Sequence, residues 1–184
     1  MRERWQIFVN SPSAQILLLI GLILGMRLVG LGLYPVMDTT EARYAEIARK
    51  MLQLNDWVVP MYSYEEPFWG KPPLAFWLAA ISMDIFGTNA FGARFPAWLC
   101  GAGTAFIIYL MVKPDRMLGC FAALLFVSSK LGYTATGDVT TDPYLMFSVS
   151  LAVYGFWQGY VKGNNTAYFL GFIGMALGLL SKGI

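Results

Sequence analysis

The sequence of 184 residues contains no histidine, only two cysteines, and few charged residues, which make up 13% of the chain. The absence of histidine removes the commonest imidazole metal ligand and the usual general base, so carboxylates must carry any acid–base chemistry. Cys100 and Cys120 lie in apolar segments, which favours small buried thiols over a disulfide. The net charge is only +2 and the basic residues are scattered, so no nucleic-acid partner is predicted.

Apolar residues are abundant instead. They make up 57% of the chain and the mean hydropathy is +0.55, compared with roughly 45–50% apolar residues in soluble proteins. The composition predicts an all-α integral membrane protein with a single membrane domain over residues 1–184. A membrane-spanning helix needs about 20 apolar residues. The apolar runs predict spans near residues 14–36, 95–112, 117–136, 143–161 and 166–181, the first as a retained signal-anchor.

Residues 71–87 form a shorter apolar run that decides the topology. About 16 residues follow Lys71 in this run, and they include Asp84, so we predict that the segment lies in the membrane interface instead of spanning. An outer loop over residues 37–92 would then hold this interfacial helix. The placement gathers nine of the eleven acidic residues on the outer side and puts the short basic loops on the inner side, as cytoplasmic loops prefer.

The stretch "MDTTEARYAEIARKM" concentrates charge at the start of that outer loop. Asp38 followed by Glu41 fits a capping-box-like helix start, and the helical pattern continues to about Leu54. Glu41 shares a packing stripe with Tyr44, Ala45, Ala48, Met51 and Leu52, whereas Arg43, Glu46 and Lys50 share the opposite face. Helix capping alone is the alternative interpretation of Asp38 and Glu41.

A second pair of acids, Asp138 and Asp142, occurs in "GDVTTDP", on the same predicted side of the membrane. The simpler interpretation is a turn that leads into a helix at Pro143. Two carboxylate pairs on one face favour a functional site.

Several basic residues lie in or beside apolar runs. Lys71 either snorkels to the lipid headgroups or binds a phosphate. Lys130 and Lys182 lie near the outer ends of apolar runs and either snorkel or face a polar cavity. Arg27 is expected near the middle of the first span, where an ionised side chain requires a partner in the protein or water.

The order of several motifs resembles a known family. "DTTEARYAEIARKM", "FWGKPPLAFWLAAISMDIFG", "TTDPYLMF" and "LLSKG" are similar to the N-terminal half of ArnT/PMT-like glycosyltransferases of the GT-C class. The resemblance implies a GT-C-like bundle with interfacial juxtamembrane helices in the first outer loop. It also implies transfer of a sugar from a polyprenyl-phosphate donor to a lipid, glycan or protein acceptor, commonly with inversion. The site would face the periplasmic side of a bacterial inner membrane.

Matching the family motifs position by position implies a set of site residues. Thr40 stands where family members commonly have an aspartate, and the nearest acid is Asp38. Gly70 replaces the glutamate that helps to bind metal in the aminoarabinose-transferring branch, so the sequence does not support a zinc site of that type. A divalent metal at another position stays open, and no other cofactor is predicted. The implied assignments are Asp38, Glu41 and Asp142 as catalytic acids, Lys71 and Arg43 as donor-phosphate ligands, and Tyr44, Asp138 and Lys182 as supporting residues.

Two other functions fit the composition. A transporter or flippase would also carry carboxylates, but transporters place them near the bilayer midplane, whereas these acids are predicted in outer loops. An inactive structural fragment is the other alternative, because family members continue for several hundred residues and the chain is expected to be an N-terminal fragment.

Overall fold

The computed structural model describes residues 11–112 and 115–183, and this part of the chain is built from helices. They are α2 (Pro12–Gly30), α3 (Thr39–Leu54), α4 (Leu74–Phe86), α5 (Ala90–Val112), α6 (Arg116–Ser128), α7 (Lys130–Ala135), α8 (Asp142–Lys162) and α9 (Asn165–Lys182). Of these described helices, α2 and α5 are long and apolar enough to cross a membrane.

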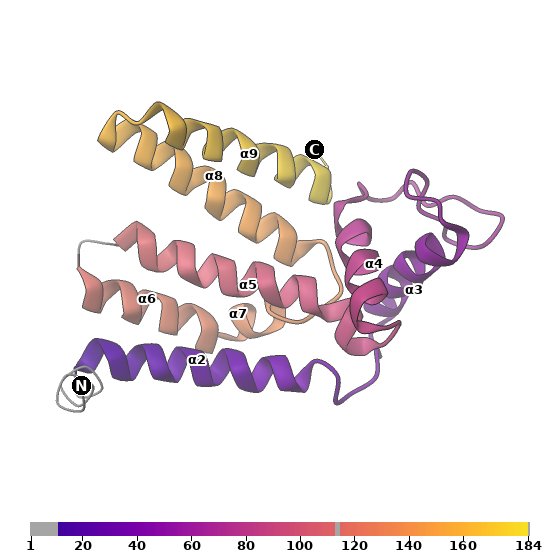
Figure 1. Cartoon of the computed structure of the whole chain (residues 1–184), viewed down its shortest axis with the longest axis horizontal. Coiled ribbons are helices and arrows are strands. Elements are labelled where there is room, and N and C mark those ends of the chain that lie inside the picture. The colour runs from indigo at the N-terminus through magenta and orange to yellow at the C-terminus, as the bar shows by residue number, and fades with distance from the viewer. Residues whose placement is uncertain (1–10, 113–114, 184) are drawn as a thin grey trace.

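The long helices form a bundle, and the two helices of the predicted outer loop cover one of its ends. Figure 1 shows α2, α5, α6, α8 and α9 side by side, with α3 and α4 at one end together with the C-terminus of α9. We call this the loop end. The connection between α7 and α8, residues 136–141, reaches the same end (Figure 1). The predicted first and second outer loops therefore lie together.

The α8–α9 hairpin depends on small residues. A side chain at Gly155 would collide with the backbone of Gly171, and one at Gly174 would collide with the backbone of Ala152. Such residues let two apolar helices approach closely, which is how helices commonly associate within lipid. The close packing fixes the start of α8 beside the end of α9.

The first helix is shorter than predicted. It ends at Gly30, whereas the apolar run predicted helix to residue 36. The Leu31 and Tyr34 carbonyl oxygens accept hydrogen bonds from the Arg94 side chain, and the Pro35 carbonyl accepts one as well. The chain therefore leaves the helix because these carbonyls have partners on α5.

The run predicted as one helix over residues 117–136 is two helices. Ser129 has extended backbone angles, and its hydroxyl accepts a hydrogen bond from the Gly132 N–H and donates one to the Phe126 carbonyl. A side chain at Gly132 would collide with that carbonyl. Hydropathy alone did not reveal this break, because it is made by local serine hydrogen bonds.

The helix predicted after Asp38 is confirmed, and its apolar stripe packs against α4. Lys50 was predicted on the polar face but is buried, because its ammonium donates to the Tyr62 carbonyl. The predicted interfacial segment forms α4, which crosses the bundle end instead of joining the bundle (Figure 1). The core between α3 and α4 contains Tyr44, Ile47, Ala48, Met51, Phe76, Ala79, Ala80 and Met83.

Candidate functional site

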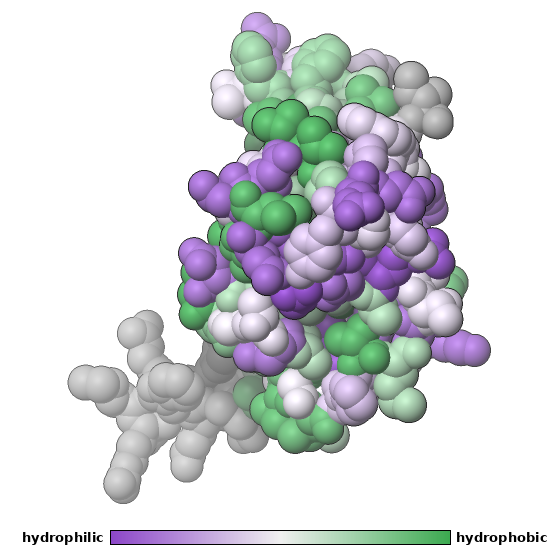
Figure 2. Space-filling model, turned by 90° about the vertical axis from the view of Figure 1, so that its right-hand side faces the viewer, coloured by the Kyte–Doolittle hydropathy of each residue, from purple (hydrophilic) through white to green (hydrophobic). Residues whose placement is uncertain are grey.

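The loop end carries most of the charge in the chain. Figure 2 faces this end and shows hydrophilic side chains gathered across it. The structure places nine acidic residues in the segments that form it: Asp38, Glu41, Glu46, Asp56, Glu65, Glu66, Asp84, Asp138 and Asp142. The clustering predicted from the sequence is therefore present. The contacts of each acid show whether its carboxylate is bound within the protein or is open to a ligand.

Asp142 and Lys182 form an ion pair in which Nζ and Oδ1 are 2.6 Å apart. Asp142 begins α8 and Lys182 ends α9, so the tight hairpin brings together two residues that are 40 positions apart. Both side chains are substantially exposed, at 66% for Asp142 and 42% for Lys182. The carboxylate is thus open to a ligand, with one cation already in contact.

Further positive charge lies at the same end of the bundle. Lys71 is partly buried and its side chain forms no ion pair or hydrogen bond within the described residues. The next residue, Pro72, lies beside the end of α9, because a Cβ atom on Gly183 would be 3.5 Å from its Cγ. Arg43, exposed near the start of α3, likewise has no ion-pair partner in the described chain. The predicted phosphate ligands are therefore unpaired cations.

Tyr44 on α3 lies near the Asp142–Lys182 pair. Burial raises the pKa of its phenol, and the charges of Arg43, Asp142 and Lys182 also act on it. Its ring makes edge contacts with Phe76 at 5.3 Å and Phe68 at 6.1 Å between ring centroids. The predicted supporting residue therefore lies within electrostatic range of the Asp142–Lys182 pair and is fixed by aromatic packing.

The two predicted catalytic acids at the start of α3, Asp38 and Glu41, have different surroundings. Asp38 is exposed, and its Oδ1 accepts hydrogen bonds from the backbone N–H groups of Thr40 and Glu41 at 2.8 and 3.2 Å. Glu41 does not complete the capping box, because its buried carboxylate binds Arg94 and accepts a bond from the Val139 N–H. Asp38 is therefore accessible to a substrate, whereas Glu41 is held inside the protein.

Arg94 is the important residue that the sequence reasoning missed. This nearly fully buried side chain donates to three carbonyls, those of Leu31, Tyr34 and Pro35, besides its pair with Glu41. A single arginine at the start of an apolar helix was the available signal, since a buried guanidinium needs several acceptors. It joins α5 to both ends of the segment that leads into α3.

Arg27 was predicted near mid-span, but it lies in the last turn of α2. Its guanidinium lies 3.4 Å from Asp138 Oδ1, donates to the Tyr34 hydroxyl and stacks over the Tyr133 ring. Burial raises the pKa of the Asp138 carboxyl, and the charge of Arg27 opposes that rise. Asp138 is therefore the partner that Arg27 required, and the ion pair attaches the loop between α7 and α8 to the end of α2.

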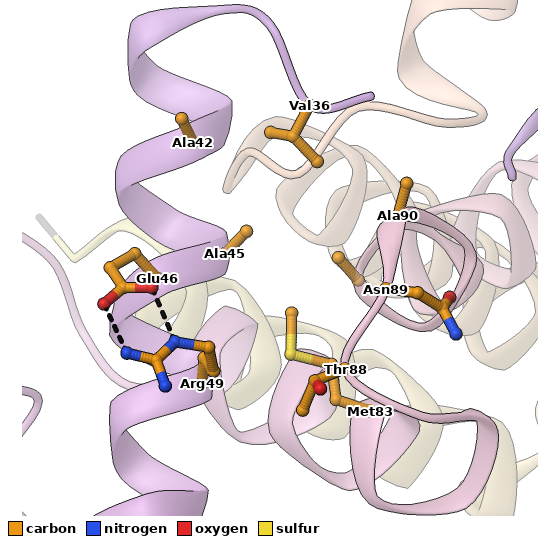
Figure 3. Close-up of a pocket in the computed structure, with 10 residues that line it drawn as sticks. Val36, Ala42, Ala45, Glu46, Arg49, Met83, Thr88, Asn89 and Ala90 are labelled. Atoms are coloured by element: carbon orange, nitrogen blue, oxygen red, sulfur yellow. Dashed lines mark hydrogen bonds and ion pairs between the residues drawn. The ribbon is translucent and has the colours of Figure 1, made fainter. Parts of the chain in front are cut away.

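The cavities at this end include two that differ in their lining. One of about 380 Å³ has Asp138 and Asp142 in its wall, with Thr134, Thr140, Leu131, Ala135, Pro143 and Met146. The other, of about 260 Å³, lies between α3 and the α4–α5 turn, and Figure 3 shows Ala45 pointing toward it from α3 and the Glu46–Arg49 ion pair along the side of the same helix. No predicted catalytic or phosphate-binding residue lines the second cavity. The first cavity is therefore the better candidate for chemistry.

The donor atoms for a metal were also considered. Among the described residues, no three His, Cys, Asp or Glu side chains are grouped so that they could hold a metal ion. Gly70, directly before Lys71, offers no ligand atom in its side chain. The described residues therefore do not fit a metal centre.

The chain is similar to known proteins over most of its length. Residues 14–184 match the family model described as dolichyl-phosphate-mannose-protein mannosyltransferase (PMT). The undecaprenyl phosphate-alpha-4-amino-4-deoxy-L-arabinose arabinosyl transferase of Pseudomonas aeruginosa is 34% identical over 78% of this chain and 27% of its own length. The protein of the same name from Wigglesworthia glossinidia brevipalpis is 30% identical over 90% of this chain and 30% of its own length.

Solved structures show the same fold. The crystal structure of ArnT from Cupriavidus metallidurans in the apo state superposes with a TM-score of 0.84 at 22% identity, covering 95% of this chain and 34% of that one. The form bound to undecaprenyl phosphate gives a TM-score of 0.81 at 23% identity, covering 95% of this chain and 33% of that one. The predicted all-α GT-C-like fold is therefore confirmed.

The chain spans less than a third of the length of these curated relatives, 27% of one and 30% of the other. The match still extends over almost all of the present sequence, from residue 14 to residue 184. Its composition and fold make it an integral membrane protein. The chain belongs to the dolichyl-phosphate-mannose-protein mannosyltransferase family.

Proposed function

We propose that this chain forms the donor-phosphate and acid-bearing end of a membrane glycosyltransferase, which moves a sugar from a polyprenyl-phosphate donor to an acceptor. The observation that carries the proposal is the Asp142–Lys182 pair, exposed at the same end of the bundle as two cations, Lys71 and Arg43, that have no ion-pair partner among the described residues. The names of the relatives, and the bound undecaprenyl phosphate in one similar structure, support this donor class.

The two cations act on the leaving group. As the bond between the anomeric carbon and the phosphate oxygen breaks, its electron pair moves to the phosphate. Preorganised cations at the edge of a membrane stabilise that growing charge. Lys71 supplies a compact ammonium and Arg43 supplies a planar guanidinium that can bind two phosphate oxygens. The acceptor oxygen forms the new bond by direct displacement, which inverts the anomeric carbon.

A carboxylate must take the proton of a hydroxyl acceptor. Asp142 is our choice because it is exposed, lines the 380 Å³ cavity and has no backbone donors holding it. Asp38 is exposed as well, but its Oδ1 caps α3, so we assign it a secondary role in orienting the acceptor. The contacts of Glu41 favour a positioning role over the role of a base, because its oxygens bind Arg94 and Val139.

We assign the loop end to the outer face of a bacterial inner membrane. In this arrangement α2, α5, α6 with α7, α8 and α9 cross the bilayer, and α4 lies in the interface. The assignment is supported by Arg116 and Lys162 at the opposite end of the bundle, since short basic loops prefer the cytoplasm. A lipid-linked donor could then place its phosphate beside Lys71 while its chain stays among the helices.

A transfer assay tests the proposal. The full chain, reconstituted in liposomes with an undecaprenyl-phosphate donor carrying a radiolabelled amino-pentose, is expected to move the label to a co-reconstituted lipid or glycan acceptor. Asp142→Asn should reduce the transfer about 10²–10⁴-fold, as expected for loss of a general base. Lys162→Gln, at the opposite end of α8, is the matched control. Translocation of intact donor without transfer would instead indicate a flippase.

A further inference from the structure

The acid that we assign as the base is not free in the structure. Lys182 Nζ is 2.6 Å from Asp142 Oδ1, so the carboxylate is already in contact with a cation. A base in such a pair is electrostatically neutralised, and its oxygen is partly occupied by the ammonium. A working site needs a means of removing the cation from the acid when the substrates arrive.

Lys182 is suited to such a movement. It occupies the last turn of α9 and is followed by Gly183, which lies beside Pro72 and so places the end of the helix next to Lys71. The side chain is 42% exposed, and a lysine ammonium on a four-carbon stem can change partners without moving the backbone. Exposed ion pairs are weak, which makes an exchange of partners easy.

We propose that Lys182 exchanges partners during the reaction: it holds Asp142 while the site is empty and turns to the donor phosphate beside Lys71 when the donor binds. The inference rests on the proposed function, because it needs a phosphate at Lys71. Donor binding then frees Asp142 to accept the proton of the acceptor, and the same movement adds a third cation around the leaving phosphate. The acid becomes available only after the donor is in place.

Within the described part of the chain, Lys182 is the cation in direct contact with Asp142, and no second cation forms an ion pair with it. Besides Lys182 from α9, the titratable groups near it are Tyr44 on α3, whose phenol feels the charges of Asp142 and of Arg43, and Asp138 across the shared cavity. Asp138 is already paired with Arg27. Phosphate and Asp142 would therefore compete for one ammonium, and this competition can be measured.

A binding cycle with undecaprenyl phosphate, which has no sugar to transfer, tests the exchange. The full chain in lipid nanodiscs is compared with Asp142→Asn, Lys182→Gln and the double variant. Asp142→Asn should bind the probe about two- to fivefold more tightly, since an exposed pair no longer has to be broken. Lys182→Gln should bind about tenfold more weakly because a charge-assisted contact is lost. The double variant should bind like Lys182→Gln.

The cycle distinguishes this inference from general electrostatics. If Asp142→Asn tightens binding equally with and without Lys182, the effect is only the removal of a repulsive charge, and the exchange is wrong. Unchanged binding in Asp142→Asn overturns it as well. Lys162→Gln, which removes the same charge at the far end of α8, should leave the affinity unchanged, and Lys182→Arg should keep the coupling.

Failure of the exchange and failure of the proposed function give different results. If the parent chain binds undecaprenyl phosphate and Lys71→Ala weakens that binding, the donor site stands whatever the cycle shows. A parent chain that does not bind undecaprenyl phosphate contradicts both the partner exchange and the proposed function. Because Asp142 and Lys182 are exposed, the variants are expected to fold, and the thermal unfolding midpoint of each is measured beside its affinity.

Discussion

Arg94 and Glu41 form a two-bonded ion pair, with Nε 2.7 Å from Oε1 and Nη2 2.8 Å from Oε2, although they are 53 residues apart in the chain. Their side chains are only 1% and 8% exposed. Removing one member of a buried pair leaves an uncompensated charge inside the protein. The pair therefore fixes the first turn of α3, and with it the position of Asp38, against the start of α5.

The first prediction concerns the stability supplied by this pair. Arg94→Met should lower the free energy of unfolding by about 3–5 kcal/mol, because Glu41 is left buried without its partner. Detergent denaturation of the purified full chain measures the change. Arg49→Met is the control, since the Arg49–Glu46 pair is 38% and 43% exposed and such pairs contribute about 0–1 kcal/mol. Equal losses in the two variants would contradict a structural role for Arg94.

Glu41→Gln separates a positioning residue from a base. If Glu41 positions α3, the variant should lose stability and activity together, since the amide cannot accept both guanidinium bonds. A base would instead lose turnover by about 10²–10⁴-fold with the unfolding midpoint unchanged. We expect the first pattern. The second would return Glu41 to the catalytic role implied by the family resemblance.

The sequence predicted the helix after Asp38 and the grouping of the two loops, because amphipathic spacing and the distribution of charge are local signals. It did not predict the roles of Arg94 and Glu41, since their contact depends on how α5 meets the segment before α3. The break at Ser129 was also missed, because a serine that caps a short helix does not alter the hydropathy. The polar contacts between residues far apart in the sequence could therefore be identified only from the structure.

The third prediction concerns Lys71. Lys71→Ala should weaken the binding of undecaprenyl phosphate about tenfold to a hundredfold, in line with the loss of a contact between charged groups worth about 1.5–3 kcal/mol. Lys71→Arg should restore only part of the affinity, because a planar fork replaces a compact ammonium. Titration of each variant in lipid nanodiscs with undecaprenyl phosphate gives the dissociation constants. Unchanged affinity in Lys71→Ala would leave this lysine as a residue that snorkels to the headgroups.

The fourth prediction concerns topology. In a background with Cys100 and Cys120 replaced by alanine, single cysteines at Glu65 and Thr140 should react with an impermeant thiol reagent added outside intact cells. A cysteine at Lys162 should react only after the membrane is permeabilised. Glu65 and Thr140 belong to the loop end and Lys162 to the other end of the bundle. Labelling of Glu65 and Thr140 from opposite sides would contradict a shared outer site.

The last prediction separates catalysis from helix capping at the two exposed acids. Asn remains a good N-cap, so Asp38→Asn should leave the unfolding midpoint close to that of the parent, whereas Asp38→Ala should cost about 1 kcal/mol. Neither Asn side chain can accept a proton as a base. Asp142→Asn should therefore lose about 10²–10⁴-fold in turnover, and Asp38→Asn should lose less, because we assign Asp38 to orienting the acceptor. Steady-state transfer with a hydroxyl acceptor gives both values. Normal turnover in Asp142→Asn would remove it as the base, and full activity in Asp38→Asn would reduce Asp38 to the cap of α3.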